Sequence, residues 1–353
     1  MADVYGIRIT PDDGGKQIIL DGSSRFISYL GYLELNGVNR TRQVKQPTPG
    51  ARQLIVPRNL VRLFVGINGP SRVFYVKSYN LSSSGVFTFD VGGHQDAQTS
   101  QNAFGFVDTF SVDGGASLGS SQYGIRIRNG SDFLNLNDTT MLGFVTYRAV
   151  VNISGSWSVP SSIVSKGSYV CFVRFSGGDR SLYLNRDSNR IEVYGPGGTS
   201  GGSVNGVQIV IVSCGFSPEL PASGYGLVIR NAAGQNTFTS KYPPVMWKGY
   251  SYNFPSYENY DTSDGEVLQW IGPSSGMSQP MIPLCSIGTQ SGDQTRSDNT
   301  WQYRAIMYSA FKMDGYSVSC ARGPTAGEGA KTLSPKAMQV ACSIPCIDAI
   351  DYF

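Results

Sequence analysis

Apolar and polar residues alternate in short runs along most of the chain. The runs VFYVKSY (73–79) and SLYLN (181–185) are examples. Alternation of this kind places successive side chains on opposite faces of a β-strand. Gly, Pro and Asn interrupt the runs roughly every 8–12 residues, and no long window repeats apolar residues at helical spacing. The pattern predicts an all-β protein whose strands build β-sandwiches.

One phrase occurs three times and suggests internal repetition. It reads YGIRIT from Tyr5, YGIRIR from Tyr123 and YGLVIR from Tyr225, at spacings of 118 and then 102 residues. A turn rich in Gly, Asn or Asp follows each copy, and a long alternating run follows the turn.

Each copy also closes on a similar apolar run. These runs are FGFVDTFSV (104–112), VQIVIVSC (207–214) and MQVACSI (338–344). Units of roughly 100 residues have the usual size of one domain with its own core. The repetition predicts three tandem β-sandwich (Ig-like) domains, diverged internal repeats, at 1–119, 120–221 and 222–353.

The net charge of +3 in 353 residues is small and does not favour a nucleic-acid partner. The distribution of the charges along the chain is more informative. Residues 35–89 carry basic side chains and no acidic one, whereas residues 249–295 carry acidic side chains and no basic one. The candidate basic patch consists of Arg40, Arg42, Lys45, Arg52, Arg58 and Arg62.

Three interpretations of the basic patch stay open. It binds phosphate groups of DNA or lipopolysaccharide, or it is a solvated face whose counter-charges come from elsewhere in the fold. In the third, the basic first repeat meets the acidic third repeat of a neighbouring subunit. Complementary patches at different places on one molecule generate rings when the rotation closes.

Aromatic residues are concentrated in the third repeat. Tyr250, Tyr252 and Phe254 share one face of a predicted strand, which we expect to pack in the core. Tyr257, Tyr260 and Trp270 lie among Pro, Asn, Asp and Gly, where burial is less expected. These last three are candidates for a protein interface or for stacking on a glycan.

Catalytic, metal and cofactor signals are weak. The single histidine, His94, lies in a Gly- and Gln-rich loop without a nucleophile motif, and the six cysteines form no CxxC pair. We expect buried free thiols, with a disulfide inside the third repeat as the alternative. The glycine run at 194–206 lacks the GK[ST] of a phosphate-binding loop. We therefore expect no enzyme, no metal and no cofactor.

Targeting signals are likewise not recognised. No apolar stretch approaches the ~18–20 residues that span a bilayer, and residues 1–30 show no basic segment followed by an apolar one. We expect a chain without a membrane span and without a cleaved export signal.

The start of the chain resembles a known group of proteins. An initial Met followed by Tyr5-Gly6, a strand, a turn containing Asp-Gly and the run QIILDGSSRFISYLGYLEL (17–35) is similar to an uncharacterised family encoded in the tail-gene region of enterobacterial phages and prophages. The resemblance covers roughly the first 35 residues and the repeat starts at Tyr123 and Tyr225. It implies a virion component of the distal tail, and it implies no functional residues.

Two classes of function follow. The first is a non-enzymatic structural protein of the phage tail tip that assists assembly and host attachment. Its expected partners are other tail proteins, two or five further copies of itself, and a host surface glycan or lipopolysaccharide. The alternatives are a free-standing glycan-binding β-sandwich protein that uses the Tyr257, Tyr260 and Trp270 aromatics, and a decoration protein of the head or shaft.

Overall fold

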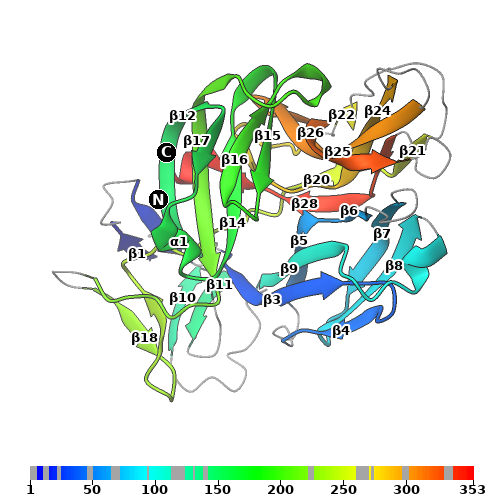
Figure 1. The fold of residues 1–353 in the computed structure, drawn as a ribbon. Coiled ribbons are helices and arrows are strands. Elements are labelled where there is room, and N and C mark those ends of the chain that lie inside the picture. The colour runs from blue at the N-terminus through cyan, green and yellow to red at the C-terminus, as the bar shows by residue number, and fades with distance from the viewer. Residues whose placement is uncertain are drawn as a thin grey trace.

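The computed structural model describes residues 6–10, 16–21, 25–45, 51–64, 72–93, 95–112, 124–129, 132–137, 142–221, 226–259, 270–271, 274–295, 302–329 and 337–353. Within them nearly all regular structure is antiparallel β-strand (Figure 1). The helical elements described are short: η1 (Gln95–Gln98), α1 (Ser161–Val164), η2 (Pro196–Gly198) and η3 (Ala349–Asp351). The all-β class predicted from the alternation is confirmed.

Residues before 113 form one hairpin and two small sheets. The hairpin pairs β1 (Gly6–Ile9) with β2 (Ile18–Asp21). One sheet has the order β3-β9-β5 and the other β4-β8-β7-β6. Their strands are β3 (Ile27–Leu35), β4 (Thr41–Gln43), β5 (Arg52–Asn59), β6 (Val61–Phe64), β7 (Arg72–Leu81), β8 (Val86–Gly93) and β9 (Gly105–Val112). Alternation along β8 buries Phe87, Phe89 and Val91 in a core that also holds Leu35 of β3.

Residues 124–214 repeat this plan. A hairpin of β10 (Gly124–Asn129) and β11 (Asp132–Asn137) comes first. The order β12-β17-β14 follows, with β15 and β16 reached through the short β13. The strands are β12 (Phe144–Ser154), β13 (Ser156–Ser158), β14 (Ser168–Arg174), β15 (Ser176–Asn185), β16 (Arg190–Tyr194) and β17 (Ser203–Cys214).

The last part of the chain begins with the hairpin of β18 (Val228–Arg230) and β19 (Asn236–Thr239). The remaining strands are β20 (Ser251–Phe254), β21 (Tyr257–Asn259), β22 (Trp270–Ile271), β23 (Pro280–Pro283), β24 (Gly288–Thr295), β25 (Gln302–Asp314), β26 (Ser317–Gly329), β27 (Ala337–Gln339), β28 (Cys342–Pro345) and β29 (Ile347–Asp348). Tyr252 and Phe254 are buried, as predicted for that strand face, whereas Tyr250 just before β20 is 41% exposed.

Strand pairing follows the repeats and also crosses between them. In each repeat the strand after the hairpin pairs with the closing strand, as β3 with β9, β12 with β17 and β20 with β28. Yet β14 pairs with β23 and β15 with β25, so one 14-stranded sheet continues across residues 221 and 222. One sheet and one core cluster are shared across the predicted boundary at residues 221 and 222. The division into three separate sandwich domains therefore stays a prediction.

The three repeats meet in a closed ring of backbone hydrogen bonds. The N–H of Gly143 donates to Ile27 O (3.0 Å), that of Val245 to Gly143 O (2.9 Å) and that of Ile27 to Val245 O (3.5 Å). These residues lie 22, 20 and 20 positions after Tyr5, Tyr123 and Tyr225, which are outside the described residues. Residues at similar distances after the three Tyr-Gly phrases therefore lie around one point.

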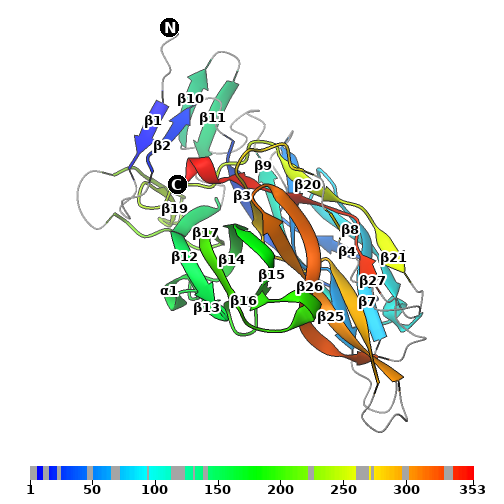
Figure 2. The ribbon, with the colours of Figure 1, turned by 90° about the horizontal axis from the view of Figure 1, so that it is seen from above.

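The ring is covered by a core and by the hairpins. Phe26, Phe144 and Trp247, one from each repeat, belong to the same buried cluster. Hairpins β1–β2 and β10–β11 lie side by side at one end of the molecule, where β19 also lies (Figure 2). The repeats are thus joined by main-chain bonds and a shared apolar core.

All six cysteines are buried and free, so the alternative of a disulfide in the third repeat is wrong in this structure. Burial raises the pKa of Cys171 and of Cys346 to about 12, because a thiolate would lose its hydration in these apolar surroundings. The cysteines act as core residues.

Candidate functional site

A cleft of about 310 Å³ is lined by residues of all three repeats, away from the ring of Ile27, Gly143 and Val245. The first repeat contributes β3, β5, β6 and β9, the second contributes the end of β15 and the turn that follows it, and the third contributes β25. Its lining residues are Tyr32, Arg58, Asn59, Arg62, Phe106, Tyr183, Leu184, Asn185, Arg186, Asp187 and Tyr308. Three arginines and four aromatic rings dominate that set.

A β-bulge directs Arg58 towards this cleft. The register of β5 against β9 runs from Val56 opposite Asp108 to Pro57 opposite Val107, and then skips Arg58. A bulged residue is released from the regular ladder and its side chain can be re-aimed. Pro57 itself has no N–H to donate to the ladder, which suits a strand that ends here.

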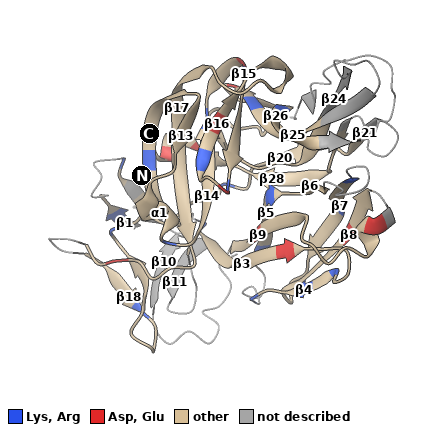
Figure 3. Cartoon of the chain, viewed as in Figure 1, with Lys and Arg blue, Asp and Glu red and all other residues tan. Residues whose placement is uncertain are grey.

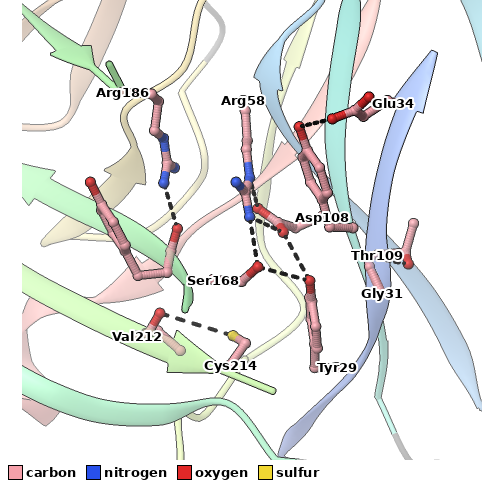
Figure 4. Close-up of polar contacts among 12 residues, drawn as sticks. Tyr29, Gly31, Glu34, Arg58, Asp108, Thr109, Ser168, Arg186, Val212 and Cys214 are labelled. Carbon is pink, nitrogen blue, oxygen red and sulfur yellow. Dashed lines mark hydrogen bonds and ion pairs between the residues drawn. The ribbon is translucent and has the colours of Figure 1, made fainter. Parts of the chain in front are cut away.

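Arg58 forms a two-pronged ion pair with Asp108, whose side chain is 1% exposed (Figure 4). Its Nε donates to Oδ2 and its Nη2 to Oδ1, each at 2.6 Å. Nη2 also donates to Ser168 Oγ at 3.1 Å, and Tyr29 Oη donates to the same hydroxyl at 3.1 Å. Parallel bonds between charged planar groups are among the strongest hydrogen bonds in proteins. The pair links β5, β9 and the first residue of β14, so it couples two repeats.

Tyr32 covers the other side of Arg58. The guanidinium carbon lies 4.3 Å from the ring centroid of Tyr32, and that ring stacks on Phe106 at 6.3 Å. Burial lowers the pKa of Arg58, but the hydrogen bonds and the charge of Asp108 outweigh burial, and the net pKa is raised. Arg58 is therefore a fixed cation with its carboxylate behind it and an aromatic ring on its face.

Arg186 is held by a polar turn between β15 and β16. Asn185 Oδ1 accepts from the N–H groups of Asp187 and Ser188, and Asn189 takes a left-handed backbone (φ 53°). The Nη1 of Arg186 donates to Tyr169 O at 2.8 Å, and its guanidinium lies 4.6 Å from the ring centroid of Tyr169.

Arg186 and Arg62 differ from Arg58 in having no ion pair with any carboxylate that the structure describes. Burial first, and then the charge of Arg58, lower the pKa of Arg186. Arg62 is exposed, and its Nη1 donates to Ala103 O at 3.0 Å. The exposed Asp187 also lines the cleft. The cleft thus presents cationic groups with unused donors.

The tyrosines of the cleft stay neutral at ordinary pH. Burial is the main cause that raises the pKa values of Tyr183 and Tyr308, and it raises that of Tyr32 to about 12. The hydroxyl of Tyr308 accepts the N–H of Leu63 at 3.2 Å. These phenols offer hydroxyl groups and apolar ring faces, which suits binding of a polar ligand.

Of the six residues of the predicted basic patch, Arg58 and Arg62 line the cleft and the other four do not. Lys and Arg positions are spread over several strands of the fold (Figure 3). Arg40 pairs with Asp90 at 3.0 Å, and Arg42 donates to the carbonyl oxygens of Asn39 and Thr41. Lys45 is exposed, and Arg52 lies 4.5 Å from the ring centroid of Trp247.

The carboxylates that pair with the basic segment come from its own repeat. They are Asp90, Asp96 and Asp108, which bind Arg40, Arg72 and Arg58 respectively. Folding back of β8, η1 and β9 supplies these counter-charges. These three arginines are therefore neutralised within the fold, and the interpretations of the basic segment as a phosphate-binding or a solvated face stay predictions.

The three aromatic candidates of the third repeat do not form one described cluster. Tyr257 lies on β21 opposite Gln339 and is half-buried, whereas Trp270 lies on β22 opposite Cys320. In hydrogen-bonding order β27, β24, β25 and β26 separate these two strands. Tyr260 and His94 lie outside the described residues. A contact role for the aromatics stays a prediction.

Sequence reasoning missed Tyr32, Tyr183, Arg186 and Tyr308. The only local signal is the turn NRDSN (185–189), which marks a polar loop and says nothing of Arg58. Within the described part of the chain, no three His, Cys, Asp or Glu side chains are grouped to hold a metal ion. Among the helices described, none has the length and apolar character needed to cross a membrane.

Comparison with known proteins gives a family and no function. Searches of curated proteins and of solved structures find no match to this chain. The profile of DUF6453, a family of unknown function, matches residues 6–330, which is most of the chain. This protein, with its all-β fold and its cleft between three repeats, belongs to the DUF6453 family.

Proposed function

We propose that this protein is a non-enzymatic structural component of the distal tail of a tailed bacteriophage, where it assists tail assembly and host attachment. The observation that carries the proposal is the ring formed by Ile27, Gly143 and Val245, which joins three repeats of one chain. Tails are built from rings of repeated units, and a closed arrangement of equivalent surfaces suits contact with such a ring. The resemblance of the first residues to tail-region proteins points the same way.

The mechanical character of the fold also supports a structural role. Cross-repeat pairing of β14 with β23 and of β15 with β25 resists separation of the repeats, because main-chain hydrogen bonds would have to break. The six free thiols are compatible with assembly in the reducing cytoplasm of the host cell. The proposed partners are other tail proteins and further copies of this chain, in threes or sixes.

The test is immunogold electron microscopy of purified phage particles with an antibody against this chain. Label at the distal tail supports the proposal. Label on the shaft or head would replace it with the decoration role, and the absence of label, with the epitope verified in lysate, would overturn a virion location. Light scattering of the purified chain tests its copy number, because three or six copies would give a mass three or six times 38.1 kDa.

A glycan-binding function is the second candidate, and a different observation favours it. The cleft combines aromatic faces with arginine and asparagine side chains, the residue types that stack on and hydrogen-bond to sugars. This candidate relocates the binding site from the Tyr257 to Trp270 segment to the junction of the repeats.

A further inference from the structure

The guanidinium groups of Arg62 and Arg186 have donors that the described structure leaves unused. Each makes one hydrogen bond, to a backbone carbonyl, although a guanidinium carries five N–H donors. Arg186 is partly buried, where an unsatisfied donor is costly unless a ligand or water binds it, whereas the guanidinium of Arg62 is exposed and open to a ligand. Both residues line the same cleft as Arg58, whose own charge is already balanced by Asp108.

The walls of the cleft are suited to a ring-shaped polar ligand. Tyr32, Phe106, Tyr183 and Tyr308 provide aromatic surface, and Asn59 provides an amide group. A volume of about 310 Å³ lies at the small end of ligand sites, which run from roughly 300 to 1,000 Å³. One or two sugar rings fit such a space far better than a folded macromolecule.

We propose that this cleft binds an acidic saccharide through its carboxylate, with Arg62 and Arg186 as the charge-recognition pair and the tyrosines as the stacking surface. Arg58 serves as a positioning residue, because Asp108 neutralises its charge and its contact with the face of Tyr32 orients that ring. That the cleft serves as the receptor-binding site of an attachment protein rests on the proposed function. Binding by the purified chain does not depend on where the protein lies in a particle.

Charge balance favours a carboxylate over a phosphate monoester. Two arginines of the cleft lack a described carboxylate partner, and the exposed Asp187 on the same lining repels anions. The two arginines and the aspartate together leave a net charge of about +1, which matches a ligand with one negative charge better than one with two.

The first experiment is isothermal titration of the purified full-length chain with three probes: a glucuronate-containing tetrasaccharide, the same tetrasaccharide with its carboxyl groups reduced to alcohols, and glucose 6-phosphate. We expect the carboxylated probe to bind at least tenfold more tightly than the reduced one, the loss that follows when one charge-assisted contact is removed. We also expect the phosphate to bind more weakly than the carboxylate, and affinity to fall as salt rises.

Variants locate the site. Arg62→Gln and Arg186→Gln should each weaken binding of the carboxylated probe by about tenfold and leave binding of the reduced probe unchanged. Arg190→Gln is the matched control, because Arg190 is exposed on the same hairpin and is not part of the cleft lining. If Arg186→Gln does not fold, Arg62→Gln and Arg62→Lys still test the proposal, since lysine keeps the charge without the planar fork.

Several results would overturn the inference: equal binding of carboxylated and reduced probes, tighter binding of the phosphate, no binding of any probe, or equal loss in Arg190→Gln. None of these results bears on gold labelling of the tail. Conversely, tight carboxylate binding without label on particles would keep the site and reject the virion location, so the two failures are distinguishable.

Discussion

The Arg58–Asp108 pair provides a sharp test of how the repeats are held together. Asp108→Asn keeps the size of the side chain but replaces a charged oxygen by an NH₂ group, which then faces a donor of Arg58. Arg58 is only 17% exposed, so its cation loses its partner where water replaces it poorly. Removing one partner of a buried pair costs roughly 3–5 kcal/mol. Because Arg58 keeps some contact with water, we expect a loss of about 3 kcal/mol in the free energy of unfolding.

The assay is urea unfolding at pH 7, monitored by tryptophan fluorescence. The free energies of unfolding of wild-type and variant are compared provided that both have the same m value, the slope against urea concentration. Asp90→Asn is the control, because the Arg40–Asp90 pair has a similar separation of 3.0 Å but side chains 37% and 50% exposed. We expect that control to lose about 1 kcal/mol or less. The double variant Arg58→Met with Asp108→Leu should recover most of the loss, because no unpaired charge stays buried.

A loss below about 1 kcal/mol in Asp108→Asn would refute the reasoning, since the pair would then behave like an exposed one. A double variant less stable than Asp108→Asn would refute the desolvation argument, and would instead make the hydrogen bonds to Ser168 and Tyr29 the main contribution.

Three further predictions follow from the core, from pH and from the thiols. Gly143→Ala should destabilise the ring by about 1–3 kcal/mol in the same urea assay, because its Cβ would lie 2.9 Å from Val212 Cγ1 and 3.1 Å from Val245 Cγ1, and an unchanged stability would contradict this packing. Lys166 and Lys241 hydrogen-bond Glu219 and lower its pKa to about 2. The stability that this lowered pKa contributes is present above pH ~4.5 and lost as pH falls towards 2, so Glu219→Gln should differ from wild-type at pH 7 and match it near pH 2. Because Glu219 is 54% exposed, the difference should be small, and a difference that grows in acid would contradict the sign. All six thiols should resist alkylation in the native chain and react in urea without reductant, as mass spectrometry would show, and a native disulfide would appear as two thiols that react only after reduction.

Local pattern was sufficient for the strands and for the repeat. Period-two alternation and Gly- or Asn-rich turns act between near neighbours, so they can be recognised in the sequence, and they predicted β7, β15, β20 and the strand–turn–strand start of each repeat. The recurring Tyr-Gly phrases indicated a repeat but did not single out Ile27, Gly143 and Val245, whose hydrogen bonds only the structure shows. The charges that neutralise Arg40 and Arg58 could not be read in this way, because Asp90 and Asp108 lie 50 residues further along the chain in each case.

The sequence by itself determined the all-β class, the buried face of strands such as β20 and the three Tyr-Gly phrases, because these depend on the period and order of residues along the chain. Only the tertiary structure decided that β14 pairs with β23, that a bulge turns Arg58 onto Asp108, and that Arg186 and Tyr308 reach the same cleft as Arg62. The physical reason is that alternation specifies which face of a strand is buried and leaves open which strand edges pair. The cleft lies between such edges, and its residues come from three repeats with no pattern in common.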